Sequence, residues 1–278
     1  MSTRPGQEAE TIAVECARLG PMIQFGSVRG FEWNRFTLPV ADLPPALEGL
    51  RLLHLSDLHT RNFWDHGLDD LIAAVQSNPP DLICFTGDFV DSKRDHRPAL
   101  VHVSRLMTSL PSRLGTYSIL GNHDGDLLGA TVASWNITPV DHRRVKLQSA
   151  GATVELIGLP GVERYDLDMA WVRGIGPKEP GTLRIVLSHF PDLLLRTKML
   201  QPDVYLTGHT HGGQICFHRN WPLVRHDALP RHLCSGVHRY GGTVLVVNRG
   251  MGFSSALQLR MNCPAEVVEI RVTRMAVA

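Results

Sequence analysis

Nine Asp, Asn and His side chains lie in five short loops that directly follow apolar, strand-like segments of this chain. They are Asp57, His59, Asp88, Asn122, His123, Asp124, His189, His209 and His211. Carboxylate, amide and imidazole donors without a thiolate suit Mn, Fe, Zn, Ni or Mg rather than a structural zinc site. A single Asp-x-His motif arises by chance in many proteins, and one such histidine alone favours a structural role. Five such loops together indicate a metal centre.

The elements that must position these loops alternate between buried strands and amphipathic helices. Strands are predicted at residues 50–55, 82–86, 117–120, 183–187 and 204–206, each directly before one of the loops. Helices are predicted at 68–75, after Pro98 and after Pro191, with a weaker strand at 153–157 and a short helix near 167–172. Runs at 243–247 and 267–272 add strands without such loops. This alternation predicts an α/β architecture in which the five loops converge at one edge.

The first thirty residues are predicted to be peripheral. Apolar residues at helical spacing precede Gly20 and Pro21, which predicts a helix that covers the core. These apolar residues are Ala9, Ile12, Ala13, Cys16 and Leu19. A weak membrane-surface contact through residues 1–30 is the alternative, less favoured because Glu8, Glu10 and Glu15 occupy the polar face. No linker divides the remainder, so we predict a peripheral segment 1–30 and a single domain 31–278.

Composition limits the function classes. The 278 residues carry 28 Lys and Arg against 27 Asp and Glu, a formal net charge of +1, so no stable nucleic-acid partner is expected. No apolar run approaches the roughly 18 residues of a membrane span, and residues 1–30 lack a signal-peptide pattern, so we expect a cytoplasmic protein. The five cysteines are scattered without a C-x-x-C pair, which argues against a disulfide framework or zinc ribbon.

In order and spacing, the loops resemble the signature of the calcineurin-like metallophosphoesterases. The matching motifs are Asp57-Leu58-His59, Gly87-Asp88, Gly121-Asn122-His123-Asp124, His189 and Gly208-His209-Thr210-His211. The resemblance spans residues 50–211 with every ligand position filled. It implies a four-layer α/β/β/α sandwich of two mixed sheets, with two divalent metal ions between their loop ends. Manganese is favoured, with Fe, Zn, Ni or Mg as alternatives.

The same resemblance implies a role for each residue. Asp57, His59, Asp88 and His211 would hold one ion, and Asp88, Asn122, His189 and His209 the other. Asp88 would bridge the ions, since a shared carboxylate offsets the repulsion between two cations. A bridging hydroxide would then attack phosphorus in line. His123 would protonate the leaving oxygen, and Asp124 would accept a hydrogen bond from the other ring nitrogen of His123. A loop cap is the alternative for Asp124.

Departures from other branches narrow the expected activity. Asp91 stands where purple acid phosphatases carry a tyrosine, and Ser92 and Asp124 break the pattern of protein Ser/Thr phosphatases. Segments 208–215, 248–252 and 259–266 are similar to a bacterial branch of small phosphodiesterases and UDP-2,3-diacylglucosamine pyrophosphatases of lipid A synthesis.

The resemblance therefore implies a phosphoesterase that hydrolyses a phosphodiester or pyrophosphate bond. Its phosphate-ester substrate could be a nucleotide or a nucleotide-linked lipid. A UDP-2,3-diacylglucosamine pyrophosphatase is the narrower alternative. A non-catalytic scaffold is disfavoured because no ligand is missing. Loops 125–145, 158–181 and 217–240 are expected to set specificity.

Overall fold

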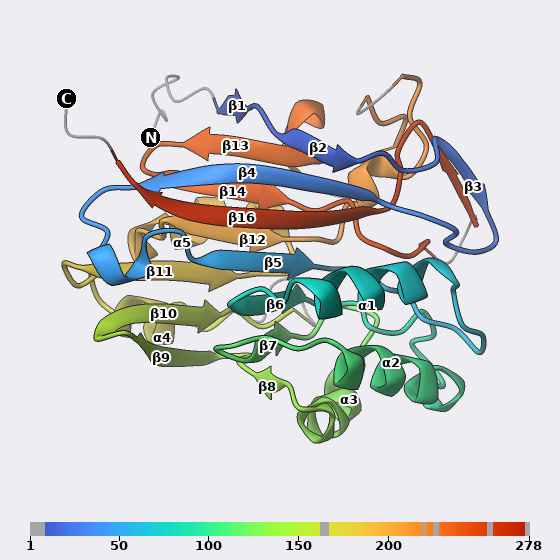
Figure 1. The fold of residues 1–278 in the computed structure, drawn as a ribbon, viewed down its shortest axis with the longest axis horizontal. Coiled ribbons are helices and arrows are strands. Elements are labelled where there is room, and N and C mark those ends of the chain that lie inside the picture. Colours follow the sequence, from blue (N-terminus) through green and yellow to red (C-terminus); the bar gives the residue numbers. More distant parts are fainter. Residues whose placement is uncertain (1–8, 162–166, 219–220, 225–227, 255–257, 276–278) are drawn as a thin grey trace.

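Two seven-stranded mixed sheets form the centre of the computed structural model, which describes residues 9–161, 167–218, 221–224, 228–254 and 258–275 (Figure 1). The first sheet has the order β1 (Glu10–Ile12), β13 (Gly236–Tyr240), β14 (Thr243–Val247), β12 (Val204–Thr207), β11 (Thr182–Leu187), β10 (Ala152–Gly158) and β9 (Arg143–Ser149). The second has the order β2 (Glu15–Arg18), β4 (Glu32–Val40), β16 (Glu266–Arg274), β5 (Arg51–Leu55), β6 (Leu82–Thr86), β7 (Thr116–Ile119) and β8 (Thr138–Pro139). A separate pair joins β3 (Ile23–Phe25) to β15 (Leu259–Met261).

Helices cover the outer face of each sheet. On the second sheet lie α1 (Gly67–Ser77), α2 (Arg97–Ser109) and α3 (Gly125–Val132), and on the first lie α4 (Met169–Gly174) and α5 (Leu194–Thr197). Short 3-10 helices are η1 (Pro45–Leu47), η2 (Ala133–Trp135), η3 (Pro191–Leu193), η4 (Lys198–Leu200), η5 (His211–Gly213) and η6 (Arg231–Leu233). The predicted four-layer α/β/β/α sandwich is confirmed.

The main core fills the space between the sheets. It includes Leu52, Cys84, Leu156, Ile185, Val246 and Ile270, all 1% exposed or less. The central strands are apolar on both faces because the sheets cover one face and the helices the other. This explains why their sequences read as continuous apolar runs rather than alternating ones.

The first described residues form strands, so the helix predicted over residues 9–19 is wrong. β1 pairs antiparallel with β13, and β2 pairs antiparallel with β4, so each extends one edge of a large sheet. Leu19, on the expected apolar face, is 73% exposed. A short run of apolar residues at helical spacing favours a helix only weakly. Hydrogen bonds to the open edges of the two sheets outweigh that preference.

The other predicted elements appear close to their expected places. The five strands before the loops are confirmed as β5, β6, β7, β11 and β12. The helix expected after Pro191 is instead three short pieces, η3, α5 and η4. Among the described residues, no helix is both long enough and apolar enough to span a bilayer.

A buried histidine links the core to the loop ends. His54 on β5 is fully buried, and its Nε2 lies 2.9 Å from Thr86 Oγ1. Since the Thr86 hydroxyl donates to Ser56 Oγ at 2.7 Å, His54 must donate from Nε2. Its Nδ1 has no hydrogen-bond partner among the described residues. Burial lowers the pKa of His54 to about 3.

This shift predicts acid sensitivity. In the unfolded chain His54 binds a proton below a pH of about 6.5, whereas in the folded chain it stays neutral down to about pH 3. As the pH falls between these values, the free energy of unfolding therefore decreases by up to about 1.4 kcal/mol per pH unit. Replacing His54 with Leu removes this contribution and flattens the pH dependence of urea unfolding between pH 6.5 and 4.5. A matched change at His66, whose side chain is 92% exposed, leaves the slope as in the unaltered protein. Equal slopes in the two variants would contradict the assignment.

Candidate metal centre

The five predicted loops meet at one end of the sandwich. Those after β5, β6 and β7 come from the second sheet, and those after β11 and β12 from the first. Backbone hydrogen bonds join them: Asp57 N donates to Gly87 O at 2.9 Å, and Gly208 N donates to His189 O at 3.2 Å. All nine residues singled out from the sequence lie in these loops, so their predicted convergence is confirmed.

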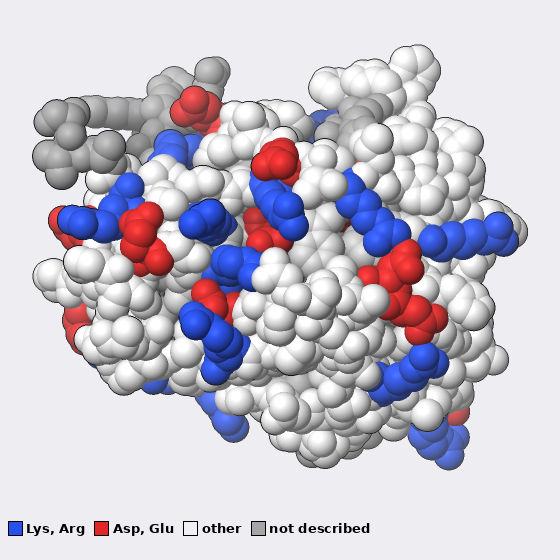
Figure 2. All heavy atoms as spheres, viewed as in Figure 1, with Lys and Arg blue, Asp and Glu red and all other residues white. Residues whose placement is uncertain are grey.

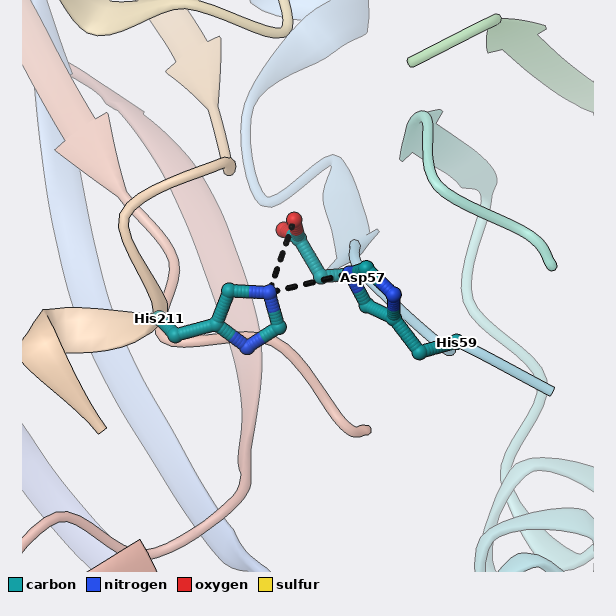
Figure 3. Close-up of side chains that lie close together, drawn as sticks. All are labelled: Asp57, His59 and His211. Carbon is teal, nitrogen blue, oxygen red and sulfur yellow. Dashed lines mark hydrogen bonds and ion pairs between the residues drawn. The ribbon is translucent and has the colours of Figure 1, made fainter. Parts of the chain in front are cut away.

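Asp57, His59 and His211 form one cluster of converging donor atoms (Figure 3). The Nε2 atoms of His59 and His211 are 3.0 Å apart, and His211 Nε2 lies 3.6 Å from Asp57 Oδ1. The three side chains are at most 3% exposed. Dashed lines in Figure 3 join the His211 ring to Asp57 and to His59. One cation could contact all three.

A second cluster contains Asp88, Asn122, His189 and His209. Asn122 Oδ1 lies 3.0 Å from His189 Nε2 and 3.1 Å from His209 Nδ1. Asp88 Oδ2 lies 3.4 Å from His189 Nε2 and 3.3 Å from His59 Nε2 in the first cluster. A single carboxylate oxygen therefore stands between the two groups of donors, at the residue for which the family resemblance implies a bridging role.

Hydrogen bonds fix which ring nitrogen faces the centre. His189 Nδ1 donates to the Thr86 carbonyl at 2.7 Å, so its Nε2 points toward Asn122 and Asp88. His59 Nδ1 lies 3.2 Å from Asp91 Oδ1 in the same way. This arrangement is usual for metal-binding imidazoles. A hydrogen bond from the second ring nitrogen to a carboxylate or carbonyl fixes the orientation of the ring, so that the other nitrogen faces the metal.

The electrostatics around the Asp88 carboxylate favour added positive charge. Burial alone would lower the pKa of His189, but Asp88, Asp57 and the hydrogen bond to the Thr86 carbonyl together raise this pKa to about 9. Burial opposes the shift at His59 as well, yet hydrogen bonds to Asp88 and Asp91 raise its pKa to about 10. Carboxylates that draw protons onto buried imidazoles suit divalent cations, which supply the same charge. The donor set therefore fits metal binding.

Five of the predicted ligands have a left-handed backbone. The φ values are 49° for Asp57, 43° for His59, 57° for Asp88, 69° for His209 and 51° for His211. Residues other than glycine rarely adopt this region, and each instance costs roughly 1–3 kcal/mol. Backbone strain of this kind is concentrated at functional sites, where the surrounding structure holds a side chain in a fixed direction.

Two glycines allow the loops to approach one another. A Cβ atom on Gly208 would collide with Ser56 Oγ and Asp57 Oδ2, and one on Gly121 would collide with Asp88 Oδ1. The backbone of one loop thus lies directly against the ligand side chain of another. Glycine is required at both positions because no other residue leaves room for the carboxylate.

Asp124 does not form its predicted contact with His123. Its buried carboxylate accepts backbone hydrogen bonds from Asp88 at 2.8 Å, Phe89 at 2.7 Å, Val90 at 3.2 Å and Gly121 at 2.8 Å. The ring of His123 instead donates from Nδ1 to the Asp91 carbonyl at 2.7 Å. The expected pairing is therefore wrong and the alternative of a loop cap is confirmed, because the unpaired amides of the 87–90 loop offer Asp124 more donors than one ring.

Two residues near the centre were missed by the sequence analysis. Asp91 orients both His59, through its side chain, and His123, through its carbonyl. Asp91 lies three residues after Asp88 in the same loop, and this position could have identified it as a residue of the centre. Arg260 on β15 is fully buried, with Nη2 3.2 Å from His211 Nδ1, and donates to the carbonyls of Arg249 and Gly252. Arg260 is 49 residues from His211 in the sequence, so no local pattern indicated that the two would be in contact.

The residues of the centre differ in their exposure to solvent. Asn122, His123 and His209 are partly exposed, whereas Asp57, Asp88 and the other histidines of the cluster are buried. A substrate would approach from the side of these three residues, and of the three only His123 lies outside the predicted ligand set.

The sequence of this chain is similar to those of several known proteins. The chain is 28% identical over 242 residues to the uncharacterized metallophosphoesterase YkoQ of Bacillus subtilis, covering 84% of this chain and 87% of YkoQ. It is 29% identical to the phosphodiesterase YaeI of Escherichia coli, over 80% of this chain and 82% of YaeI. It is 26% identical to the UDP-2,3-diacylglucosamine pyrophosphatase LpxG of Chlamydia trachomatis, over 81% and 84%.

The calcineurin-like phosphoesterase family model matches residues 50–213, which hold all five loops. Because this match covers more than half of the 278 residues, the chain belongs to the calcineurin-like phosphoesterase family.

Proposed function

We propose that this protein uses two divalent metal ions to hydrolyse a phosphodiester or pyrophosphate bond. The observation that carries the proposal is the position of Asp88 Oδ2, 3.3 Å from His59 Nε2 and 3.4 Å from His189 Nε2. One oxygen between two groups of ligands suits a bridging role. The similarity to a phosphodiesterase and to a pyrophosphatase supports these two bond types.

The ligand sets follow from the two clusters. Asp57, His59, Asp88 and His211 would hold the first ion, and Asp88, Asn122, His189 and His209 the second. Held by these residues, two divalent ions would supply positive charge for the phosphoryl oxygens and would make a bound water more acidic. Manganese as the favoured ion and a cytoplasmic location stay predictions from the sequence.

His123 would act as the general acid. Its Nδ1 must carry a proton because it donates to the Asp91 carbonyl at 2.7 Å. Nε2 is then the nitrogen that can hold a second proton and pass it to the leaving oxygen. The backbone N–H of His123 donates to Asp88 Oδ1 at 2.8 Å, which ties the acid to the bridging carboxylate. Asp124 would position both residues by capping the 87–90 loop.

A UDP-2,3-diacylglucosamine pyrophosphatase is the second candidate. The similarity to LpxG over 81% of this chain favours it. Release of UMP and a lipid monophosphate would distinguish it from a general phosphodiesterase.

Hydrolysis assays test the proposed class directly. We expect turnover of an aryl phosphodiester with about two bound ions per chain after reconstitution with Mn, Zn, Fe, Ni or Mg, each tested separately. The corresponding monoester is the comparison substrate, and elemental analysis gives the metal content. Absence of bound metal would overturn the proposal. Bound metal without turnover of either ester would direct the assays to UDP-linked lipids.

Replacing His123 with Ala should separate chemistry from metal binding. We expect both ions to stay bound, while kcat falls about 10²- to 10⁴-fold for an ester with a poor leaving group. An activated aryl ester should lose far less, since its leaving group departs without a proton. His66, which is exposed, provides the matched control substitution. Equal losses on the two esters would rule out the general-acid role.

Replacing Asp88 with Ala should lower metal content as well as rate. Removal of the shared anion is expected to reduce binding from about two ions per chain to about one or fewer. The same change at Asp95, which pairs with Arg97 on the surface, should leave both quantities unaltered. Circular dichroism of each variant checks that the chain is folded. An unchanged metal-to-protein ratio in a folded Asp88 variant would contradict the bridging assignment.

A further inference from the structure

Four short segments form a small sheet beside the metal centre. β3 pairs antiparallel with β15, with Ile23 opposite Met261 and Phe25 opposite Leu259. Residue Ile215 forms a parallel bridge with Met261, and Cys216 forms an antiparallel bridge with Pro222. The spatial order is therefore 23–25, 259–261, 215–217 and 221–223. The last two segments follow directly from η5, which begins at the predicted ligand His211.

The two faces of this small sheet differ completely. The inward face carries Gln24, Cys216, Pro222 and Arg260, all buried, and Arg260 contacts His211. Alternation along each strand places the remaining side chains outward. These are Ile23, Phe25, Ile215, Phe217, Trp221, Leu223, Leu259 and Met261, and we call them the apolar face. Every outward position is apolar.

Much of the apolar face is open to solvent. Phe217 is 75% exposed, Phe25 71% and Ile23 67%, with Leu223 at 51% and Trp221 at 47%. Figure 2 shows the lobe over β3, at the upper right, as a mostly white surface with few charged side chains. Contiguous exposure of large apolar and aromatic side chains is rare on soluble surfaces unless something binds there.

Arginines border this face. Arg29 lies four residues after Phe25 and is exposed, and Arg61 donates to the Gly26 carbonyl at 2.7 Å. Arg231 donates to the carbonyls of Pro222 and Leu223 on the opposite side. Phenylalanine, tryptophan and leucine surrounded by arginine match the composition of segments that enter the headgroup region of an anionic bilayer.

We propose that the apolar face binds the surface of a phospholipid bilayer containing anionic lipids. A second copy of this chain fits less well, because a symmetric contact would bring the arginines of both copies together. Ile23 and Phe25 come from the N-terminal segment for which a membrane-surface contact was the alternative expectation. The contact extends from there across β15 to residues 215–223.

Binding through this face would bring the metal centre to the lipid headgroups, since Ile215 is four residues from His211. A phosphodiester or pyrophosphate in a lipid headgroup would then lie within reach. This last step rests on the proposed function, whereas bilayer binding does not.

Co-sedimentation of the full chain with vesicles tests the proposal. We expect binding to vesicles of phosphatidylcholine with phosphatidylglycerol, weaker binding to phosphatidylcholine alone, and a loss of binding as salt rises, because salt screens the arginines. Replacing Phe25 and Phe217 together with Ser should lower the partition coefficient about tenfold or more. The matched control replaces Val101 and Leu195 with Ser. These two residues lie outside the apolar face and are 66% and 47% exposed, so this variant should bind vesicles as the unaltered chain does.

Hydrolysis of a soluble aryl phosphodiester, measured on the same samples, keeps the two proposals separate. The Phe25 and Phe217 variant should retain this activity and the circular dichroism of the unaltered chain. Failure to bind either vesicle, or equal losses in the two double variants, would overturn the bilayer contact whether or not the ester is hydrolysed. A dimer that dissociates only in the Phe25 and Phe217 variant would also overturn it, in favour of self-association.

Discussion

The burial of the Asp88 carboxylate is the constraint on which the rest of the centre depends. Its Oδ2 lies between His59 and His189, and its Oδ1 accepts from the backbone of His123. A buried carboxylate is unstable unless positive charge or hydrogen-bond donors surround it. Most features of the site can be understood as means of surrounding this one group.

Several of these means lie in the backbone. Asp124 gathers the amides of the 87–90 loop and so fixes the direction in which Asp88 points. The left-handed conformation of Asp57, His59 and Asp88 turns each side chain sharply at the end of its strand. The Asp88 carboxylate packs directly against the backbone of Gly121. These backbone conformations cost free energy, and the burial of the large apolar core between the sheets compensates for that cost.

Much of this arrangement could be predicted from the sequence because its signals are local. A buried strand followed by a polar loop is visible in a short stretch of sequence. Its repetition indicated an α/β architecture and the convergence of nine side chains, whereas the two-sheet sandwich was implied by the family resemblance. The errors arose where distant parts of the chain decide the outcome. The helical spacing of residues 9–19 was overridden by pairing with β13 and β4, which lie far along the chain. The contacts of Arg260, and those of Asp124 with the backbone of residues 88–90, likewise depend on residues far along the chain.

The position of the centre across both sheets has a consequence for folding energetics. Its donors come from β5, β6 and β7 on one side and from β11 and β12 on the other, so an ion held by both groups joins the two halves of the sandwich like a cross-link. A ligand that binds only the native state adds its binding free energy to the stability of that state. The supply of metal would therefore set the resistance of this protein to unfolding and proteolysis as well as its turnover.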